Sequence, residues 1–355
     1  MPRHIDTLQT PCVLIDLDRA EANLKRAQDY ADAHGVRLRP HIKTHKLPLF
    51  AKRQLELGAI GITCQKLGEA EVMADAGIED IFLPYNLMAP EKLYRLKQLA
   101  QRVTLAVTAD STYVVDGYAD TFADSTDAPL RVLVECDTGA GRCGVQTPDD
   151  AVALARYIAD KPGLVFGGLM TYPPAGDAAG ARKWLEEAAG KLEAAGLPAE
   201  TISTGGTPDI WRAHETPLAT EYRPGTYIYY DRSLVSRGVA AVEDCALTVL
   251  ATVVSRPTEN RAIIDAGSKA LTSDLLGQNG YGIVLGYPDA VIYGQSEEHA
   301  NIDFSASAKK PVVGERIRIL PNHACPVSNL FDHVNLISGD HVVETVEVAA
   351  RGRVD

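Results

Sequence analysis

The feature that most constrains the fold is a regular alternation of short apolar segments with longer amphipathic ones over the first two-thirds of the chain. This alternation is typical of a parallel α/β fold, because a helix must return the chain to the start of each next strand. We count eight strand-like segments, about 20–35 residues apart, the number and spacing that a (β/α)8 TIM-type barrel needs. They are Val36–Arg39, Ala59–Thr63, Asp80–Leu83, Val103–Val107, Leu130–Glu135, Leu164–Met170, Glu200–Ser203 and Tyr227–Tyr229.

Helical periodicity is clear in three of the intervening segments. Asp18–His34, Leu67–Ala76 and Ala181–Ala195 carry apolar residues at helical spacing. Each is followed directly by a glycine, the residue that most often ends a helix. These segments are therefore predicted to be helices.

From about residue 240 the pattern changes to short segments rich in Val, Ile and Thr, separated by Gly and Pro, which is typical of β structure. We predict a barrel domain over 18–236 and a β-rich C-terminal domain over 237–355. The opening strand-like segment Cys12–Asp16 could join either domain, and we assign residues 1–17 to the β-rich one. The expected strands of that domain are Cys245–Ser255, Arg261–Asp265, Arg316–Leu320 and His341–Ala349.

Composition narrows the possible partners and location. The formal net charge is −12 and no run of basic residues occurs, so nucleic acid and anionic membranes are not expected partners. No apolar stretch is long enough to span a membrane, and no signal-peptide pattern opens the chain. The six cysteines lack the spacing of a disulfide framework, so we expect a reduced, cytoplasmic protein.

A lysine-rich turn, Arg-Pro-His-Ile-Lys-Thr-His-Lys over residues 39–46, follows the first predicted strand. In TIM-type barrels the loops that leave the C-terminal strand ends build the active site. A buried lysine at such a position can have a lowered pKa and act as an amine nucleophile. Lys43 is therefore a candidate catalytic residue.

The other predicted strand ends also carry polar groups and glycines. Gln65 follows the second strand, Arg142 lies in a Gly-rich loop after the fifth, and Tyr172 follows the sixth. The turn Ser203-Thr204-Gly205-Gly206 follows the seventh strand, and Arg223-Pro-Gly225-Thr226-Tyr227 adjoins the eighth. Glycine turns let backbone N–H groups approach a phosphate, and a helix N-terminus at Pro208 would add its dipole. Together with Lys43 they indicate pyridoxal 5'-phosphate (PLP), although a solvent-exposed turn is the alternative for 204–207.

His323 and Cys325 form a candidate metal site. On an extended segment, side chains two residues apart leave the same face. An imidazole and a thiolate suit zinc better than magnesium, and two protein ligands would leave positions for water or substrate. The alternative is a loop histidine beside a buried cysteine.

Several motifs together resemble the D-threonine aldolase and D-serine dehydratase family, over residues 10 to about 345. Besides the turn at 39–46 and the two Gly turns, they are Asp265-Ala-Gly-Ser-Lys269, Ser296-Glu-Glu-His299 and Pro321-Asn-His-Ala-Cys325. The resemblance implies a fold-type III PLP enzyme, with an alanine-racemase-like barrel, a C-terminal β domain and a homodimer. It implies that Lys43 binds PLP covalently, that Lys46 is a surface residue at a helix start, and that His323 and Cys325 bind the metal.

The resemblance also implies roles for the remaining site residues. Arg142 would contact the 3-oxygen of PLP, Tyr172 would lie against the cofactor, and Gln65 would contact the cofactor or the substrate carboxylate. Arg223 would face the pyridine nitrogen, with Glu221 as a rival for that position. Other residues expected to contact the cofactor are Ser203, Thr204, Gly205, Gly206, Gly225, Thr226 and Tyr227.

The function that this resemblance implies is a PLP- and divalent-metal-dependent lyase acting on small β-hydroxy-D-amino acids. We expect D-threonine-aldolase-type cleavage, with D-serine or 3-hydroxyaspartate dehydration as the alternative; a racemase would need a second base and no metal. Aldolases of the family often carry Asp at the second ligand position, where this chain has Cys325, so zinc is expected before manganese or magnesium. The general base stays open between Lys43, a metal-activated water, His299 and His333.

Overall fold

The computed structural model describes residues 3–355, which divide by contacts into two compact units. The barrel unit comprises residues 27–43, 48–225 and 353–355. The β-rich unit comprises residues 3–26, 44–47 and 226–352. The main boundary thus falls after Gly225, earlier than the expected 236, and helix α1 (Leu17–His34) is shared by the two units.

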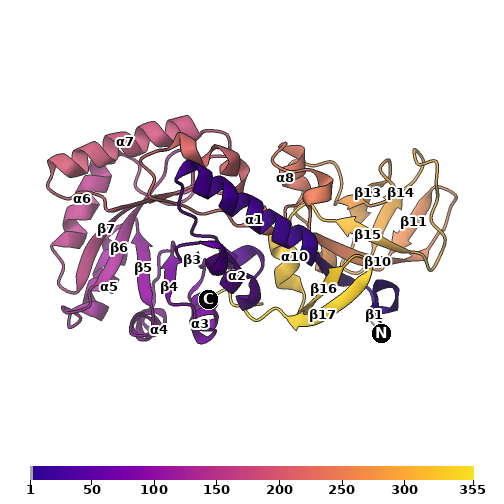
Figure 1. Cartoon of the computed structure of the whole chain (residues 1–355), viewed down its shortest axis with the longest axis horizontal. Coiled ribbons are helices and arrows are strands. Elements are labelled where there is room, and N and C mark those ends of the chain that lie inside the picture. Colours follow the sequence, from indigo (N-terminus) through magenta and orange to yellow (C-terminus); the bar gives the residue numbers. More distant parts are fainter. Residues whose placement is uncertain (1–2) are drawn as a thin grey trace. The chain divides into compact units, whose positions relative to one another are not determined.

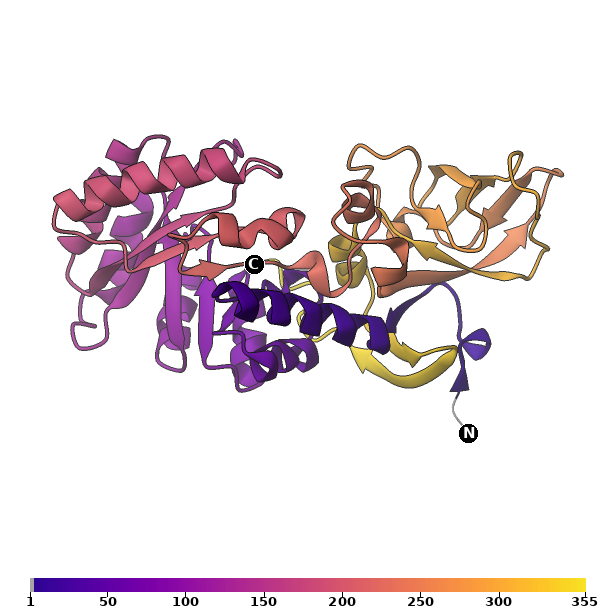
Figure 2. The same cartoon turned by 45° about the horizontal axis from the view of Figure 1, so that its top comes forward.

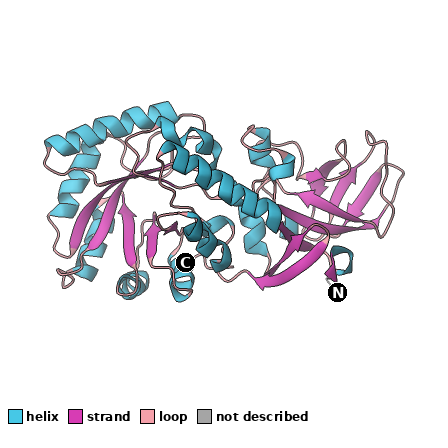
Figure 3. Ribbon diagram, viewed as in Figure 1, coloured by secondary structure: helices cyan, strands magenta, loops and turns pink. Residues whose placement is uncertain are grey.

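The barrel unit is built on a parallel sheet with strand order β3-β4-β5-β6-β7-β8-β9. Its strands alternate with helices along the chain, as the sequence predicts (Figure 1, Figure 3). The strands are β3 (Ile62–Thr63), β4 (Asp80–Leu83), β5 (Thr104–Ala109), β6 (Leu130–Cys136), β7 (Leu164–Thr171), β8 (Thr201–Thr204) and β9 (Glu221–Tyr222). The helices are α2 (Pro48–Leu57), α3 (Leu67–Asp75), α4 (Pro90–Ala100), α5 (Thr112–Phe122), α6 (Pro148–Ala159), α7 (Ala178–Ala194) and the 3-10 segment η3 (Thr207–Glu215).

The extended segment 37–41 closes this sheet into a barrel. Leu38 forms a parallel bridge with Tyr222 of β9, and His41 forms one with Thr63 of β3. On one side the Arg39 N–H donates to the Tyr222 carbonyl at 2.9 Å; on the other the Thr63 N–H donates to the Pro40 carbonyl at 2.8 Å. The segment therefore acts as the first barrel strand, although Pro40 has no N–H to donate and interrupts a continuous ladder.

The prediction that Tyr227–Tyr229 is the last barrel strand is wrong. These residues lie in and just after the 3-10 turn η4 (Thr226–Ile228), and the strand that pairs with β8 is β9. All three residues are buried, so their apolar and aromatic character reflects burial rather than strand pairing. The barrel architecture itself is confirmed by the parallel sheet and the two bridges that close it.

The β-rich unit is formed mainly by a ten-stranded sheet (Figure 2, Figure 3). The strand β2 (Cys12–Asp16) lies between β10 and β16 in this sheet, antiparallel to the first and parallel to the second. The opening strand therefore belongs to this unit. The strands besides β2 are β1 (Arg3–His4), β10 (Leu247–Ser255), β11 (Arg261–Ile264), β12 (Ile283–Val284), β13 (Val291–Gln295), β14 (Ala300–Asp303), β15 (Arg316–Leu320), β16 (His333–Ser338) and β17 (His341–Glu347).

Short helices connect these strands: α8 (Arg232–Ser236), α9 (Ser268–Leu271) and α10 (Ala324–Leu330), with 3-10 turns at Ile5–Thr7 and Val242–Asp244. Leu14 and Leu250, from neighbouring strands, pack with Ile337 in one core cluster of this unit. Among the helices of residues 3–355, none combines the length and the hydropathy of a membrane span.

Candidate active site

The lysine turn begins where the first barrel strand ends. Lys43 is half-buried in the 3-10 turn η2 (Ile42–Thr44), directly after the closing segment 37–41. Pro40 and Ile42 fix the turn, because Pro40 cannot continue a strand ladder and Ile42 is fully buried. The structure therefore holds Lys43 at a C-terminal strand end, where barrels of this type expose reactive groups.

The buried His41 and the half-buried Gln65 form a hydrogen-bonded pair close to that lysine. His41 Nε2 lies 3.0 Å from Gln65 Oε1, and the Lys43 N–H points at His41 Nδ1. Burial, together with the charge of Lys43, holds the pKa of His41 well below its usual value. His41 is therefore neutral with its proton on Nε2, and Gln65 is oriented by it.

Arg142 and Tyr172 meet at the ends of strands β6 and β7. The guanidinium of Arg142 lies over the Tyr172 ring, 5.1 Å from its centroid. Asp137 stabilises the loop that carries Arg142, because its carboxylate accepts the N–H groups of Gly139 and Gly141. Both predicted side chains are thus brought together, and both are exposed.

The Gly turn after β8 is shaped by two tyrosine rings. Gly205 has φ +90°, and a Cβ there would lie 2.1 Å from the Tyr222 ring. A Cβ at Gly206 would lie 2.9 Å from the ring of Tyr172. Gly206 is also the N-cap of η3, which begins at Thr207. Position 205 therefore requires glycine, and the turn leads into the N-terminus of η3, a kind of position at which backbone N–H groups can bind phosphate.

Arg223 and Glu221 occupy different places in the barrel interior. Arg223 donates through Nη1 to Ser203 Oγ at 2.5 Å and through Nη2 to the Thr171 carbonyl at 2.7 Å. Burial lowers the pKa of Arg223 to about 10 despite the opposing effect of Glu221. Both carboxylate oxygens of Glu221 are engaged, one by Ser203 and one by Arg39, so Arg223 is the better placed of the two to face a ligand.

In the β-rich unit, His323 and Cys325 lie at the start of α10 rather than on an extended segment. His323 is the N-cap of the helix, with extended backbone angles, and Cys325 is in its first turn. The expectation of two side chains on one strand face is therefore wrong, because the chain turns into a helix between them. The His323 side chain nevertheless hydrogen-bonds Cys325, so the two donors are adjacent.

Sequence reasoning missed Asp274, which orients the imidazole of His323. Asp274 Oδ2 lies 2.7 Å from His323 Nδ1. Burial alone would lower the pKa of His323, but its bonds to Cys325 and Asp274 raise it to about 9. With Nδ1 engaged, Nε2 is the nitrogen that remains for a metal, as in carboxylate–histidine–zinc arrangements. The two residues lie 49 positions apart, and no pattern in the sequence links them.

Three further residues of the same unit surround Cys325 and its helix. The hydroxyl of Thr44 lies 3.2 Å from Cys325 Sγ, and that of Thr226 lies 3.6 Å from it. The buried carboxylate of Asp231 accepts the N–H of Ala324 at 3.0 Å. Thr226 was expected to contact the cofactor, whereas Thr44 and Asp231 were not singled out.

The expectation that Lys46 is a surface residue at a helix start is wrong. Lys46 is buried with φ +55°, and its ammonium donates to the Ala350 carbonyl at 3.3 Å. It therefore has a structural contact instead of a surface position.

The two histidines of the β-rich unit that are candidates for the general base, His299 and His333, are both exposed. Tyr227 is buried in η4.

Comparison with known proteins follows the same division of the chain. The "Alanine racemase, N-terminal domain" family matches residues 15–233, and the "Putative serine dehydratase domain" family matches residues 246–337. A D-threonine aldolase from Arthrobacter is 35% identical over 360 residues, covering 97% of this chain and 93% of the relative. The chain belongs to the D-threonine aldolase and D-serine dehydratase family.

Solved structures of family members have the same fold. The D-threonine aldolase of Filomicrobium marinum has a TM-score of 0.92 at 33% identity, covering 100% of this chain and 99% of that one. The D-threo-3-hydroxyaspartate dehydratase of Delftia has a TM-score of 0.89 at 35% identity, covering 97% and 98%. A variant of such a dehydratase with a cysteine replaced by alanine is described as metal-free. The family is one of PLP-dependent lyases.

Proposed function

We propose that this protein is a PLP- and divalent-metal-dependent lyase that cleaves β-hydroxy-D-amino acids in the manner of a D-threonine aldolase. The observation that carries the proposal is the Gly205–Gly206 cradle, closed by Tyr222 and Tyr172, at the same barrel end as Lys43. That end combines an amine with a glycine turn at the start of η3, and the family's characterised members are lyases.

The chemistry of the barrel residues fits PLP, because a different group is available for each expected contact. Lys43 would hold the cofactor covalently through Nζ, and the turn from Thr204 to Gly206 would hold its phosphate together with Gly225 and Thr226. The Ser203 hydroxyl is fully buried and bonds Glu221 and Arg223. Arg223, fixed at two points, would face the ring nitrogen. Arg142 and Tyr172 would border the ring and its 3-oxygen. When bound, PLP supplies an electron sink for the pair released at the substrate Cα.

His323 and Cys325 fit a divalent metal through the chemistry of their donors. An imidazole nitrogen held by Asp274 and an adjacent sulfur form a pair that favours zinc. Among residues 3–355, no three His, Cys, Asp or Glu side chains are arranged to hold a metal. We propose water or substrate as the other ligands. A bound metal supplies Lewis acidity, which lowers the pKa of a coordinated hydroxyl.

One observation favours dehydration as the second candidate. Cys325, the proposed sulfur ligand, stands where aldolases of this family often carry Asp, and the metal-free cysteine variant belongs to a dehydratase. The relatives include both a D-threonine aldolase and a D-threo-3-hydroxyaspartate dehydratase at 35% and 37% identity. We also propose that the protein is a cytoplasmic homodimer. Size-exclusion chromatography with light scattering would test the dimeric state.

Product analysis separates the two reactions. Metal-stripped, PLP-loaded protein would be incubated with D-threonine, with and without added Zn²⁺ or Mn²⁺. Cleavage yields glycine and acetaldehyde, whereas dehydration yields 2-oxobutyrate and ammonia. D-threo-3-hydroxyaspartate would be tested in parallel, and L-threonine controls for stereochemistry. If the metal-restored protein formed neither cleavage nor dehydration products from either D-substrate, the proposal would be overturned.

A further inference from the structure

A column of polar side chains passes through the barrel interior below Arg223. Arg223 Nη1 donates to Ser203 Oγ at 2.5 Å, and Ser203 Oγ in turn donates to Glu221 Oε1 at 2.5 Å. The other carboxylate oxygen, Oε2, accepts from Arg39 Nε at 2.7 Å. The bonds therefore run without a break from Arg39 to Arg223.

This column is unusual for a barrel interior, which is normally filled by layers of branched apolar side chains. Ser203 is 0%, Glu221 5% and Arg223 5% exposed. A buried charge is costly unless it is paired and hydrogen-bonded. Here the Glu221 carboxylate lies between the guanidinium groups of Arg39 and Arg223. The Ser203 hydroxyl donates to the carboxylate and accepts from Arg223. Each buried charge in the column is therefore hydrogen-bonded.

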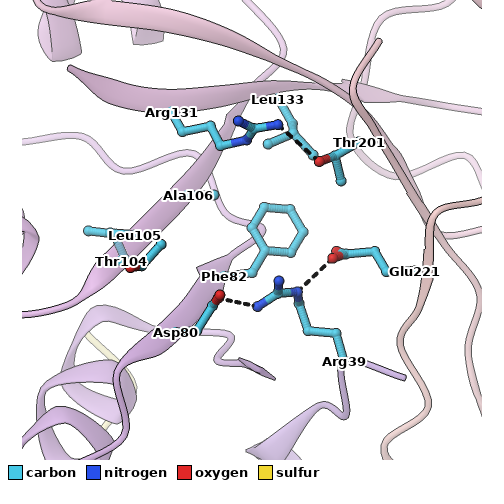
Figure 4. A pocket seen from close by; sticks show the side chains of 10 residues that line it. All are labelled: Arg39, Asp80, Phe82, Thr104, Leu105, Ala106, Arg131, Leu133, Thr201 and Glu221. Atoms are coloured by element: carbon cyan, nitrogen blue, oxygen red, sulfur yellow. Dashed lines mark hydrogen bonds and ion pairs between the residues drawn. The ribbon is translucent and has the colours of Figure 1, made fainter. Parts of the chain in front are cut away.

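The far end of the column reaches a cavity at the N-terminal ends of the strands. Arg39, Asp80 and Glu221 line this cavity, whose volume is about 250 Å³ (Figure 4). Arg39 Nη1 donates to Asp80 Oδ1 at 2.5 Å. Figure 4 shows the Arg39 guanidinium between the two carboxylates, so Arg39 anchors Glu221 from the cavity side.

We propose that Glu221, acting through Ser203, is a positioning residue for Arg223 and supplies the counter-charge that sets how Arg223 acts on bound PLP. This inference rests on the proposed function, because it needs PLP at the opposite end of the barrel. In this proposal Glu221 acts indirectly, because its two carboxylate oxygens accept hydrogen bonds from Ser203 and Arg39. The titratable groups that interact electrostatically with Arg223 are Glu221, Glu135, Arg142, Tyr222 and His41.

The test is a pH titration of the visible absorbance of the PLP-loaded protein, comparing wild type with Glu221→Gln. The cationic form of the cofactor–lysine linkage is stabilised by a nearby negative charge. Removing that charge should lower the titration midpoint by about 0.5–1 pH unit. Glu200→Gln is the matched control, because Glu200 pairs with Arg131 at the same cavity but not with the column. An unchanged midpoint in Glu221→Gln would overturn the inference.

Ser203 variants test the column without removing a charge. Ser203→Ala should weaken PLP binding about fivefold to tenfold, because Arg223 loses one of its two fixed contacts. Ser203→Thr keeps the hydroxyl and should restore both the affinity and the midpoint. Equal behaviour of the Ala and Thr variants would contradict the role of the hydroxyl. If wild-type protein bound no PLP, the proposed function would fail first, so the two failures are distinguishable.

Discussion

The Thr44 hydroxyl lies 3.2 Å from Cys325 Sγ, although the two residues are 281 positions apart. Thr44 follows Lys43 directly in the chain. The residue next to the candidate PLP lysine is thus in hydrogen-bond contact with a candidate metal ligand.

Replacing Thr44 with valine should weaken zinc binding about tenfold, since hydrogen bonds to a ligand sulfur tune metal affinity. Thr44 is fully buried, and valine keeps its shape while removing the hydroxyl. Chelator competition measures the affinity, and Thr44→Ser should recover it. Zinc affinity equal to wild type in Thr44→Val would show that the contact has no such role.

Asp274→Ala should reduce zinc affinity by about 10–100-fold, because His323 would lose the partner of its Nδ1. Glu298→Ala is the control, because Glu298 is an exposed carboxylate that pairs only with Lys269 among the ion pairs described. Asp265→Ala is unsuitable as a control, because the Asp265 carboxylate accepts the backbone N–H of Thr252. Metal content after dialysis is the measurement. Retention of one zinc per chain by Asp274→Ala at wild-type affinity would contradict the assignment.

Lys43→Ala should abolish covalent PLP attachment, whereas Lys46→Met should retain it. The two lysines lie in the same turn, but the Lys46 ammonium is buried against the Ala350 carbonyl. Borohydride reduction followed by peptide mass spectrometry locates the adduct. An adduct on Lys46 in the wild-type protein would reverse the assignment of the two residues.

Gly205→Ala should destabilise the protein by about 2–4 kcal/mol, through left-handed backbone strain plus overlap with Tyr222. Gly196→Ala is the matched control: Gly196 has φ +74°, but nothing lies within 4 Å of its added Cβ. Strain alone should cost the control about 1–2 kcal/mol. Urea unfolding of both variants checks this difference, and PLP affinity should fall only in Gly205→Ala.

The apoprotein should lose stability in mild acid partly through His41. The pKa of His41 is lowered in the folded state by burial and by Lys43. Below about pH 6.5 the unfolded chain therefore binds a proton at His41 that the folded chain does not bind. Stability is therefore full above about pH 6.5 and falls as the pH drops toward the folded pKa. From pH 6.5 to 5.5 wild type should lose roughly 1 kcal/mol more than His41→Asn. Parallel losses in urea unfolding at the two pH values would contradict this.

Local pattern predicted many elements closely. The strands β2, β4 and β15 have the expected bounds, because each has a buried apolar centre flanked by polar residues or a turn. The same criterion failed at Tyr227–Tyr229, where burial is equally complete but no strand pairs. The apolar character of each residue indicates whether it is buried. Strand pairing also requires a neighbouring strand, which the local sequence does not identify.

The sequence alone thus determined the alternation of strands and helices, the β-rich second part and the turn that carries Lys43, since these depend on local periodicity and turn chemistry. Only the tertiary structure decided that Asp274 bonds His323, that Thr44 reaches Cys325, and that Ser203 joins Glu221 to Arg223. The physical reason is that a hydrogen bond requires two groups to meet within about 3 Å. Packing of the whole chain determines whether residues far apart in the sequence come into contact. Such contacts produce no local pattern in the sequence from which they could be predicted.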